Sequence, residues 1–270
     1  IYGSPLGKLP LWVAIQRAWF SKWYGRKMDS IKSKNKILPF ISNYNLDENE
    51  FLNDPSTFQS FNEFFSRELK ENARPIDQSN ESIVFPADGR HLGIQNLSKV
   101  ERIFVKGQKF DLSSLFQSEQ LAKVYQEGSM VISRLCPVDY HRFHFPVSGF
   151  ATEPKLINGS LFSVNPIALR KNIGIFWQNK RYLSFIRDSA VGNVACFLVG
   201  ATCVGSVNIT SPLPTLVKKG EELGYFRFGG SSVLTLFEKG AVKLSADLLD
   251  STESGIELYA KMGQALGEKL

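Results

Sequence analysis

The sequence Phe228-Gly229-Gly230-Ser231-Ser232 lies between two strand-like runs, residues 223–227 and 233–237, and its interpretation decides the fold of this chain. Glycine permits positive φ and serine favours turns, so the first interpretation is the tight turn of a β-hairpin. The second is a reactive peptide bond, in which the Ser231 hydroxyl attacks the carbonyl of Gly230. Glycine leaves that carbonyl sterically open. The rest of the chain decides between the two.

The N-terminal segment predicts an amphipathic helix over residues 9–28. Four apolar residues recur at spacings of three and four and form one stripe: Trp12, Ile15, Trp19 and Trp23. Residues 1–38 hold eight Lys or Arg against one acid. A tryptophan stripe with basic flanks is typical of a helix at an anionic membrane surface. The alternative is a helix that packs this stripe on the protein's own core.

The remainder of the chain changes from helical to β-type texture. Residues 61–69 predict a helix, with Ser60 as N-cap and Glu63 completing a capping box. From Ile83 onward, short β-type runs alternate with Gly, Pro and Asn. We therefore predict an α+β fold, with N-terminal helices followed by a mostly antiparallel β-sheet or barrel-like sandwich core. The predicted domains are a helical, membrane-surface region over residues 1–75 and a β-rich catalytic domain over residues 76–270.

The charge and the cysteine content indicate which binding partners and which cellular compartment to expect. The formal net charge is +6, but no RNP-type motif, zinc-finger spacing or long basic tract is present, which argues against nucleic acid. The three cysteines are odd in number and lack CxxC spacing. This pattern is typical of reduced core residues and favours a cytosol-facing compartment.

Two polar groups interrupt the apolar texture ahead of Ser231. Asp88 follows a strand-like run, where its ordinary role is an Asx-type turn. His141 and His144 lie in an aromatic, proline-bounded segment. An HxxH pair is half of a metal site, but no third or fourth ligand has motif spacing, so we predict no metal. The two histidines are either incidental or a general acid and base that act near neutral pH.

Asp88, one of the two histidines and Ser231 would together form a nucleophilic constellation. A serine becomes a nucleophile when a base removes its proton, and a carboxylate helps by holding the tautomer of that base. The residues alone do not distinguish His141 from His144. The chain has no Gly-x-Ser-x-Gly elbow, which disfavours an α/β-hydrolase.

Taken in order, these segments resemble the phosphatidylserine decarboxylase family, pyruvoyl-dependent enzymes made as self-cleaving proenzymes. The resemblance covers nearly the whole chain. The segments that carry it are residues 61–67, 74–76, 86–89, 139–149, 159–166, 199–206 and 219–226, which precede the cleavage motif. Two motifs depart from the family pattern. The usual Leu-Gly-Ser-Thr reads Gly229-Gly230-Ser231-Ser232, which keeps the Gly-Ser bond. Asn179-Lys180-Arg181 replaces the frequent Asn-Glu-Arg, which concerns a local salt bridge and not the reaction.

The resemblance implies a role for each site residue in self-cleavage. Asp88 orients His144, and His144 deprotonates Ser231, whose oxygen attacks the carbonyl of Gly230. The amide becomes an ester, and β-elimination then divides the protein into a β-chain, residues 1–230, and an α-chain, residues 231–270.

The implied cofactor is a pyruvoyl group derived from Ser231 itself. Its ketone forms a Schiff base with the substrate amine and accepts the electrons released by decarboxylation, as pyridoxal phosphate does. His141 would lie near the substrate carboxylate and reprotonate the carbanion.

The implied substrate is phosphatidylserine in an anionic membrane surface, converted to phosphatidylethanolamine and CO2. The resemblance also implies a carboxy-lyase that is a peripheral membrane protein on the cytoplasmic face of the cell membrane, a homodimer in which the cleaved α- and β-chains stay associated. Three alternatives stay open: a pyruvoyl decarboxylase of a soluble amino acid, a serine hydrolase using Asp88, His144 and Ser231 on an external ester, and a catalytically inactive lipid-surface module.

Overall fold

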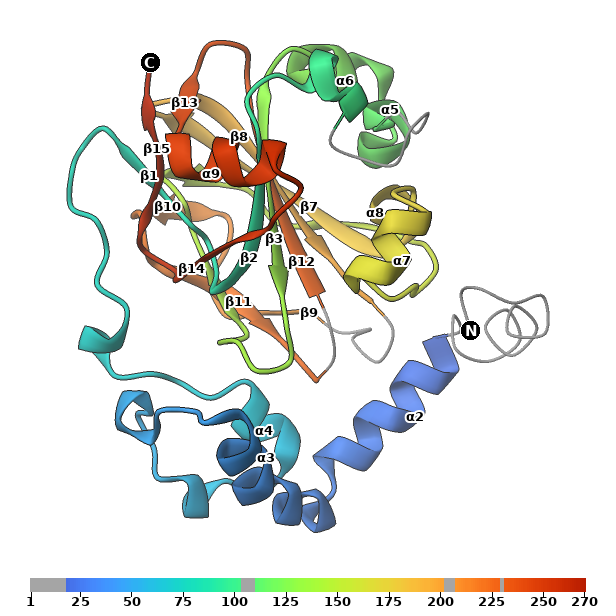
Figure 1. Ribbon diagram of the computed structural model, residues 1–270, viewed down its shortest axis with the longest axis vertical. Coiled ribbons are helices and arrows are strands. Elements are labelled where there is room, and N and C mark those ends of the chain that lie inside the picture. Colours follow the sequence, from blue (N-terminus) through green and yellow to red (C-terminus); the bar gives the residue numbers. More distant parts are fainter. Residues whose placement is uncertain (1–17, 103–109, 202–206, 229–230) are drawn as a thin grey trace.

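The computed structural model of the chain describes residues 18–102, 110–201, 207–228 and 231–270. Short helices form one end of the molecule, and a large twisted sheet with flanking helices forms the rest (Figure 1). Within the described ranges, no helix is long and apolar enough to cross a bilayer. The predicted helix over residues 9–28 is seen from Ala18 onward, whereas Trp12 and Ile15 lie outside the described residues.

The N-terminal helices pack around a cluster of phenylalanine rings. The helices are α2 (Ala18–Asp29), α3 (Ile37–Tyr44) and α4 (Phe61–Phe65), joined by 3-10 helices at Ile31–Lys36, Glu48–Glu50 and Pro55–Thr57, with another at Glu71–Ala73. Their buried core is Met28, Ile37, Ile41, Phe51, Phe58, Phe61, Phe64 and Phe65. This end of the molecule therefore has an apolar core of its own.

The predicted helix at residues 61–69 is shorter in the structure. Ser60 is its N-cap as predicted, since its Oγ accepts the N–H of Glu63 at 3.2 Å. The carboxylate of Glu63 accepts the N–H of Gln59 at 2.6 Å rather than that of Ser60, so the capping box is one residue out of place. The helix ends at Phe65 because the chain then turns to form a β-bridge between Leu69 and Phe51.

In the described part of the chain, the main sheet has nine strands, all antiparallel to their neighbours, in the order β10-β5-β7-β8-β12-β3-β2-β14, with β6 beside β7. Their bounds are β2 Gly89–Ile94, β3 Ser129–Leu135, β5 Gly149–Ala151, β6 Lys155–Ile157, β7 Arg181–Ser189, β8 Gly192–Val199, β10 Thr215–Val217, β12 Ser231–Phe237 and β14 Leu258–Ala260. β12 is central and fully buried, so its alternate residues face two apolar cores: Val233 and Phe237 face one, Leu234 and Leu236 the other.

Two three-stranded sheets and several helices complete the fold. One sheet is β1 (Ser82–Val84), β15 (Ala265–Lys269) and β13 (Val242–Leu244), and the other is β4 (Arg142–His144), β11 (Glu222–Phe226) and β9 (Val207–Ile209). The helices are α5 Leu112–Phe116, α6 Glu119–Tyr125, α7 Pro166–Lys171, α8 Ile175–Gln178 and α9 Ala246–Glu253, with a 3-10 helix at Leu97–Arg102. The predicted α+β class with mostly antiparallel sheets is confirmed, and the sheets of the described residues do not close into a barrel.

The hairpin interpretation of the segment around Ser231 is wrong. β11 ends just before this segment and pairs with β4 and β9, whereas β12 begins at Ser231 and pairs with β3 and β8 in the main sheet. The segment therefore connects two different sheets. Gly229 and Gly230 lie outside the described residues.

Candidate active site

Strand direction gathers the predicted site residues at one edge of the main sheet. Because neighbouring strands are antiparallel, β2 and β12 begin where β3 ends. Ser231, the first residue of β12, lies opposite Leu135, the last residue of β3. Asp88 directly precedes β2, and the chain after β3 leads through residues 136–140 to His141. The topology thus brings three distant parts of the sequence together.

Ser231 has a buried and unpaired hydroxyl. Its side chain has no exposed area, and its Oγ has no hydrogen-bond partner among the described residues. A hydroxyl taken out of water without a partner costs free energy, so such a group is rarely left unused. Gly230, the other half of the predicted cleavage bond, lies outside the described residues.

His144 presents a nitrogen that can accept a proton. Its Nδ1 lies 2.9 Å from the carbonyl oxygen of Gly220. A carbonyl only accepts, so Nδ1 carries the proton of the neutral ring and Nε2 carries the lone pair. Nε2 is buried, and nothing in the described part of the chain hydrogen-bonds to it. The backbone N–H of His144 donates to the carbonyl of Pro86 at 2.7 Å, which fixes the residue beside the segment that carries Asp88.

Burial lowers the pKa of His144 below its ordinary value of 6.5, while the Gly220 carbonyl, Glu222 and Asp88 act in the opposite direction. The ring is therefore neutral at pH 7 and has its Nε2 lone pair available. The nearby carboxylates would stabilise the charged ring once a proton has been accepted.

His141 is fully buried and is oriented in a similar way. Its Nδ1 lies 2.9 Å from the carbonyl oxygen of Asp139, and its ring lies 3.9 Å from the ring of Phe65 in α4. The helical end of the molecule therefore contributes one wall around this histidine. Each histidine is oriented by a backbone carbonyl, that of Asp139 for His141 and that of Gly220 for His144.

Asp88 lies in the same region but is held by an arginine. Its side chain is 1% exposed, and both of its carboxylate oxygens lie 2.9 Å from Arg74 Nε, with a further contact of 2.6 Å to the guanidinium. The backbone N–H of Met262 donates to Oδ1 at 2.8 Å. No hydrogen bond joins Asp88 to His144, although both residues are described. The Gly220 carbonyl, and not Asp88, sets the tautomer of His144.

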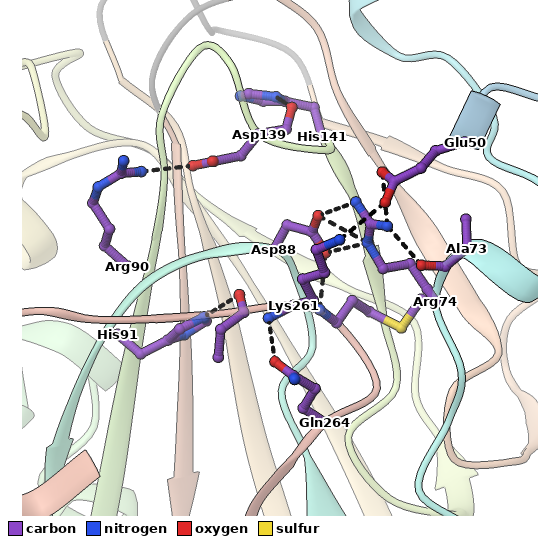
Figure 2. Close-up of polar contacts among 12 residues, drawn as sticks. Glu50, Ala73, Arg74, Asp88, Arg90, His91, Asp139, His141, Lys261 and Gln264 are labelled. Carbon is purple, nitrogen blue, oxygen red and sulfur yellow. Dashed lines mark hydrogen bonds and ion pairs between the residues drawn. The ribbon is translucent and has the colours of Figure 1, made fainter. Parts of the chain in front are cut away.

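A network of charged side chains around Asp88 was not predicted from the sequence. Arg74 also contacts Glu50 at 3.0 Å, and Glu50 accepts a hydrogen bond of 2.9 Å from Lys261 (Figure 2). These residues come from three distant parts of the chain, so no spacing in the sequence links them. The nearest signal was the Arg-Pro pair at residues 74 and 75, which the resemblance included without giving it a role.

A second missed group surrounds Asp139. Its Oδ2 accepts the backbone N–H of Cys136 at 2.6 Å and lies 3.3 Å from Arg90 (Figure 2). Burial raises the pKa of the Asp139 carboxyl, although these two contacts lower it. The hydrogen bond from Cys136 links the residue that follows β3 to Asp139, whose carbonyl orients His141. Among the described residues, no cluster of three His, Cys, Asp or Glu side chains is suited to bind a metal ion.

Comparisons with known proteins agree with one another. The family model described as phosphatidylserine decarboxylase matches residues 61–268. A phosphatidylserine decarboxylase proenzyme of Fusobacterium nucleatum is 44% identical over 269 residues, covering 100% of this chain and 90% of the relative. One from Clostridium novyi is 42% identical over 270 residues (100% and 92%), and one from Chlamydia muridarum is 44% identical over 250 residues (93% and 83%).

Proposed function

The chain belongs to the phosphatidylserine decarboxylase family and is a decarboxylase made as a proenzyme, and we propose that it acts on phosphatidylserine with a pyruvoyl group derived from its own Ser231. One observation carries the proposal: Ser231 Oγ and His144 Nε2 are both buried, and neither has a hydrogen-bond partner among the described residues. Ser232 and Thr235 of the same strand also have buried hydroxyls without a partner among the described residues, so Ser231 is distinguished by its place in the Gly230–Ser231 bond. The unpaired Nε2 of His144 supplies a base.

The position of Ser231 fits a group made from the chain itself. Encoded side chains include no ketone, so an electrophilic carbonyl must come from a cofactor or from backbone chemistry. Ser231 begins the central strand β12. Ser231 itself pairs with Leu135 of β3, and the next residue, Ser232, pairs with Val199 of β8 on the other side. A group at this position would be held at the start of a strand that is paired on both sides.

Self-cleavage would begin with proton transfer from the Ser231 hydroxyl to His144 Nε2. The oxygen attacks the carbonyl of Gly230, and the proton passes to the nitrogen of Ser231 as the amide becomes an ester. Loss of the α proton of residue 231 and rupture of its Cβ–O bond release Gly230 as a carboxylate. Water then adds and ammonia leaves, which yields the ketone. Asp88 and Glu222 would assist by stabilising the protonated ring of His144.

In the decarboxylation step, the ketone would supply an electron sink for the pair released as CO2 leaves. His141 would hold the proton that is delivered to the carbon that has lost CO2. Its burial and its contact with Phe65 support this role, because a dry environment favours proton transfer to carbon over exchange with water.

The membrane surface is the proposed place of action, and helix α2 is the proposed contact. Trp23 is 54% exposed, and the neighbouring Arg26 and Lys27 are exposed as well. Lys27 Nζ lies 5.7 Å from the centre of the Trp23 ring. An exposed indole beside cationic side chains suits the headgroup layer of an anionic bilayer. Trp19 lies in α2, but its surroundings are outside what the structure describes.

Intact-mass measurement of the wild type beside Ser231→Ala tests the central claim. We expect the wild type to give two fragments divided between residues 230 and 231, with the smaller one blocked to Edman degradation. Ser231→Ala and His144→Ala should stay whole. His141→Ala should be cleaved but release CO2 from phosphatidylserine slowly. A wild-type protein that stays full length and still releases CO2 would refute the proposal.

The membrane part of the proposal has a separate test. Binding to vesicles that contain phosphatidylserine should weaken when Trp12, Trp19 and Trp23 are replaced by serine, and it should weaken further in high salt because exposed charges are screened. Unchanged binding in both conditions would remove α2 from the account without affecting the chemistry at Ser231.

A further inference from the structure

The chain just before the proposed cleavage bond is anchored to the N-terminal helices. The backbone N–H of Phe228 donates to Oδ1 of Asn62 at 2.8 Å. The ring of Phe228 packs edge-on against Phe61 and Phe65 of α4, with ring centres 5.2 and 5.0 Å apart. On the other side of the bond, Ser231 is fixed as the first residue of β12. Two anchored points therefore flank the bond in the sequence.

Asn62 is built as a fixed link rather than as a surface amide. It is 4% exposed, and its Nδ2 donates to Oδ1 of Asp29 at 2.8 Å and to the carbonyl of Gly25 at 3.4 Å. The orientation of the amide follows from its partners, because the Phe228 N–H only donates and the Asp29 carboxylate only accepts. Asp29 also contacts Arg227 at 3.3 Å. A buried amide with its donors and acceptor paired holds its neighbours in one arrangement.

We propose that Asn62 is a positioning residue for self-cleavage, acting through the backbone of Phe228 to bring the Gly230 carbonyl onto the Ser231 hydroxyl. This inference rests on the proposed function, since it requires cleavage between residues 230 and 231. Intramolecular attack needs the reacting atoms about 3–3.5 Å apart, and a displacement of about 1 Å costs about a hundredfold in rate. Two residues, Gly229 and Gly230, separate Phe228 from Ser231, so fixing both ends limits the paths that the chain between them can take.

A cell-free synthesis experiment tests the inference by following conversion of the full-length chain into two fragments over time. In Asn62→Leu, which removes the acceptor for Phe228, we expect cleavage to be at least tenfold slower than in the wild type. In Asn62→Asp, an acceptor remains but a carboxylate now faces Asp29, so we expect an intermediate rate. Adding Asp29→Asn to that variant restores a donor opposite the new carboxylate and should bring the rate within about threefold of the wild type.

Ser60→Ala is the matched control for a merely structural effect. It removes the N-cap of α4, the helix that carries Asn62, and should lower the melting temperature because a lost cap costs about 1 kcal/mol. It leaves the bond between Asn62 and Phe228 untouched, so its cleavage rate should match the wild type. A merely structural role of Asn62 would instead make cleavage follow melting temperature across all the variants.

Three outcomes would overturn the inference: Asn62→Leu cleaves as fast as the wild type, Ser60→Ala slows cleavage as much as Asn62→Leu does, or the exchanged pair Asn62→Asp with Asp29→Asn is no faster than Asn62→Asp alone. If Asn62→Leu does not fold, the comparison of the exchanged pair with Asn62→Asp decides the matter. A wild type that is never cleaved would count against the proposed function itself, which separates the two failures.

Discussion

Replacing Arg74 with methionine should destabilise the protein more than removal of any exposed ion pair. Arg74 is 8% exposed and lies against Asp88, which is 1% exposed. Methionine fills the volume of the arginine stem but supplies no donor, so the one hydrogen bond that Asp88 would keep among the described residues is that from the N–H of Met262. The substitution therefore leaves a carboxylate buried without its cation.

The expected loss in the free energy of unfolding is about 3–5 kcal/mol, because removing one partner of a buried ion pair leaves the other charge uncompensated. Arg74→Lys keeps the charge but loses the two-pronged guanidinium geometry, so its expected loss is smaller, about 1–2 kcal/mol. The matched control is Arg227→Met. Arg227 pairs with Asp29 at 3.3 Å, but both side chains are 43% exposed, and an exposed pair contributes only about 0.2–1 kcal/mol.

The assay is urea unfolding at pH 7, followed by tryptophan fluorescence, with every substitution placed in the Ser231→Ala chain so that each protein is one covalent molecule. The difference in free energy comes from the shift in midpoint at an unchanged slope. If Arg74→Met loses less than about 1 kcal/mol, or no more than Arg227→Met does, then burial does not govern the strength of this ion pair.

Three further predictions concern pH and packing. Because burial lowers the pKa of His144 below 6.5, the rate of self-cleavage should be level above pH 7 and fall only below pH 6.5; a rate already halved at pH 7 would contradict this. Burial also lowers the pKa of His91 to about 3. The stability that the neutral ring provides above pH 6.5 should therefore be lost as the pH falls toward 3. In His91→Gln, the unfolding free energy should fall less steeply over that window, by about 1 kcal/mol per pH unit. In Gly128→Ala, a Cβ would lie 1.9 Å from the carbonyl oxygen of Phe237 and should cost at least about 2 kcal/mol. In Gly25→Ala, inside α2, the Cβ meets no atom within 4 Å and should stabilise the protein by about 0.5–1 kcal/mol; thermal melts of the two variants compare them.

Local signals in the sequence predicted the elements better than their partners. Ser60 caps α4 as predicted, because a cap depends on residues three apart. The α+β class followed from the change of texture after Ile83. The hairpin interpretation around Ser231 was wrong, because periodicity reveals a strand but not the strands it pairs with. β12 pairs with β8 and with β3, which lies about a hundred residues earlier.

The candidate site shows the same division. The sequence supplied Asp88, His144 and Ser231 as chemically suitable residues, and the fold brings their segments to one edge of the sheet. The sequence did not indicate that Arg74 binds Asp88, which lies fourteen residues away. Nor could it supply the carbonyl of Gly220, which orients His144, because a backbone atom has no signature in the sequence.

The central place of β12 has a consequence for the mature protein if the chain is cut ahead of Ser231. The smaller piece, residues 231–270, would provide β12 and β14 to the main sheet and β13 and β15 to a second sheet. β12, β14 and β15 each pair with a strand of the larger piece, whereas β13 pairs with β15. The two polypeptides would be interwoven and could part only by unfolding. Renaturation from denaturant would then be a second-order event, and the melting midpoint of the mature enzyme would rise with protein concentration, whereas that of the uncut Ser231→Ala precursor would not.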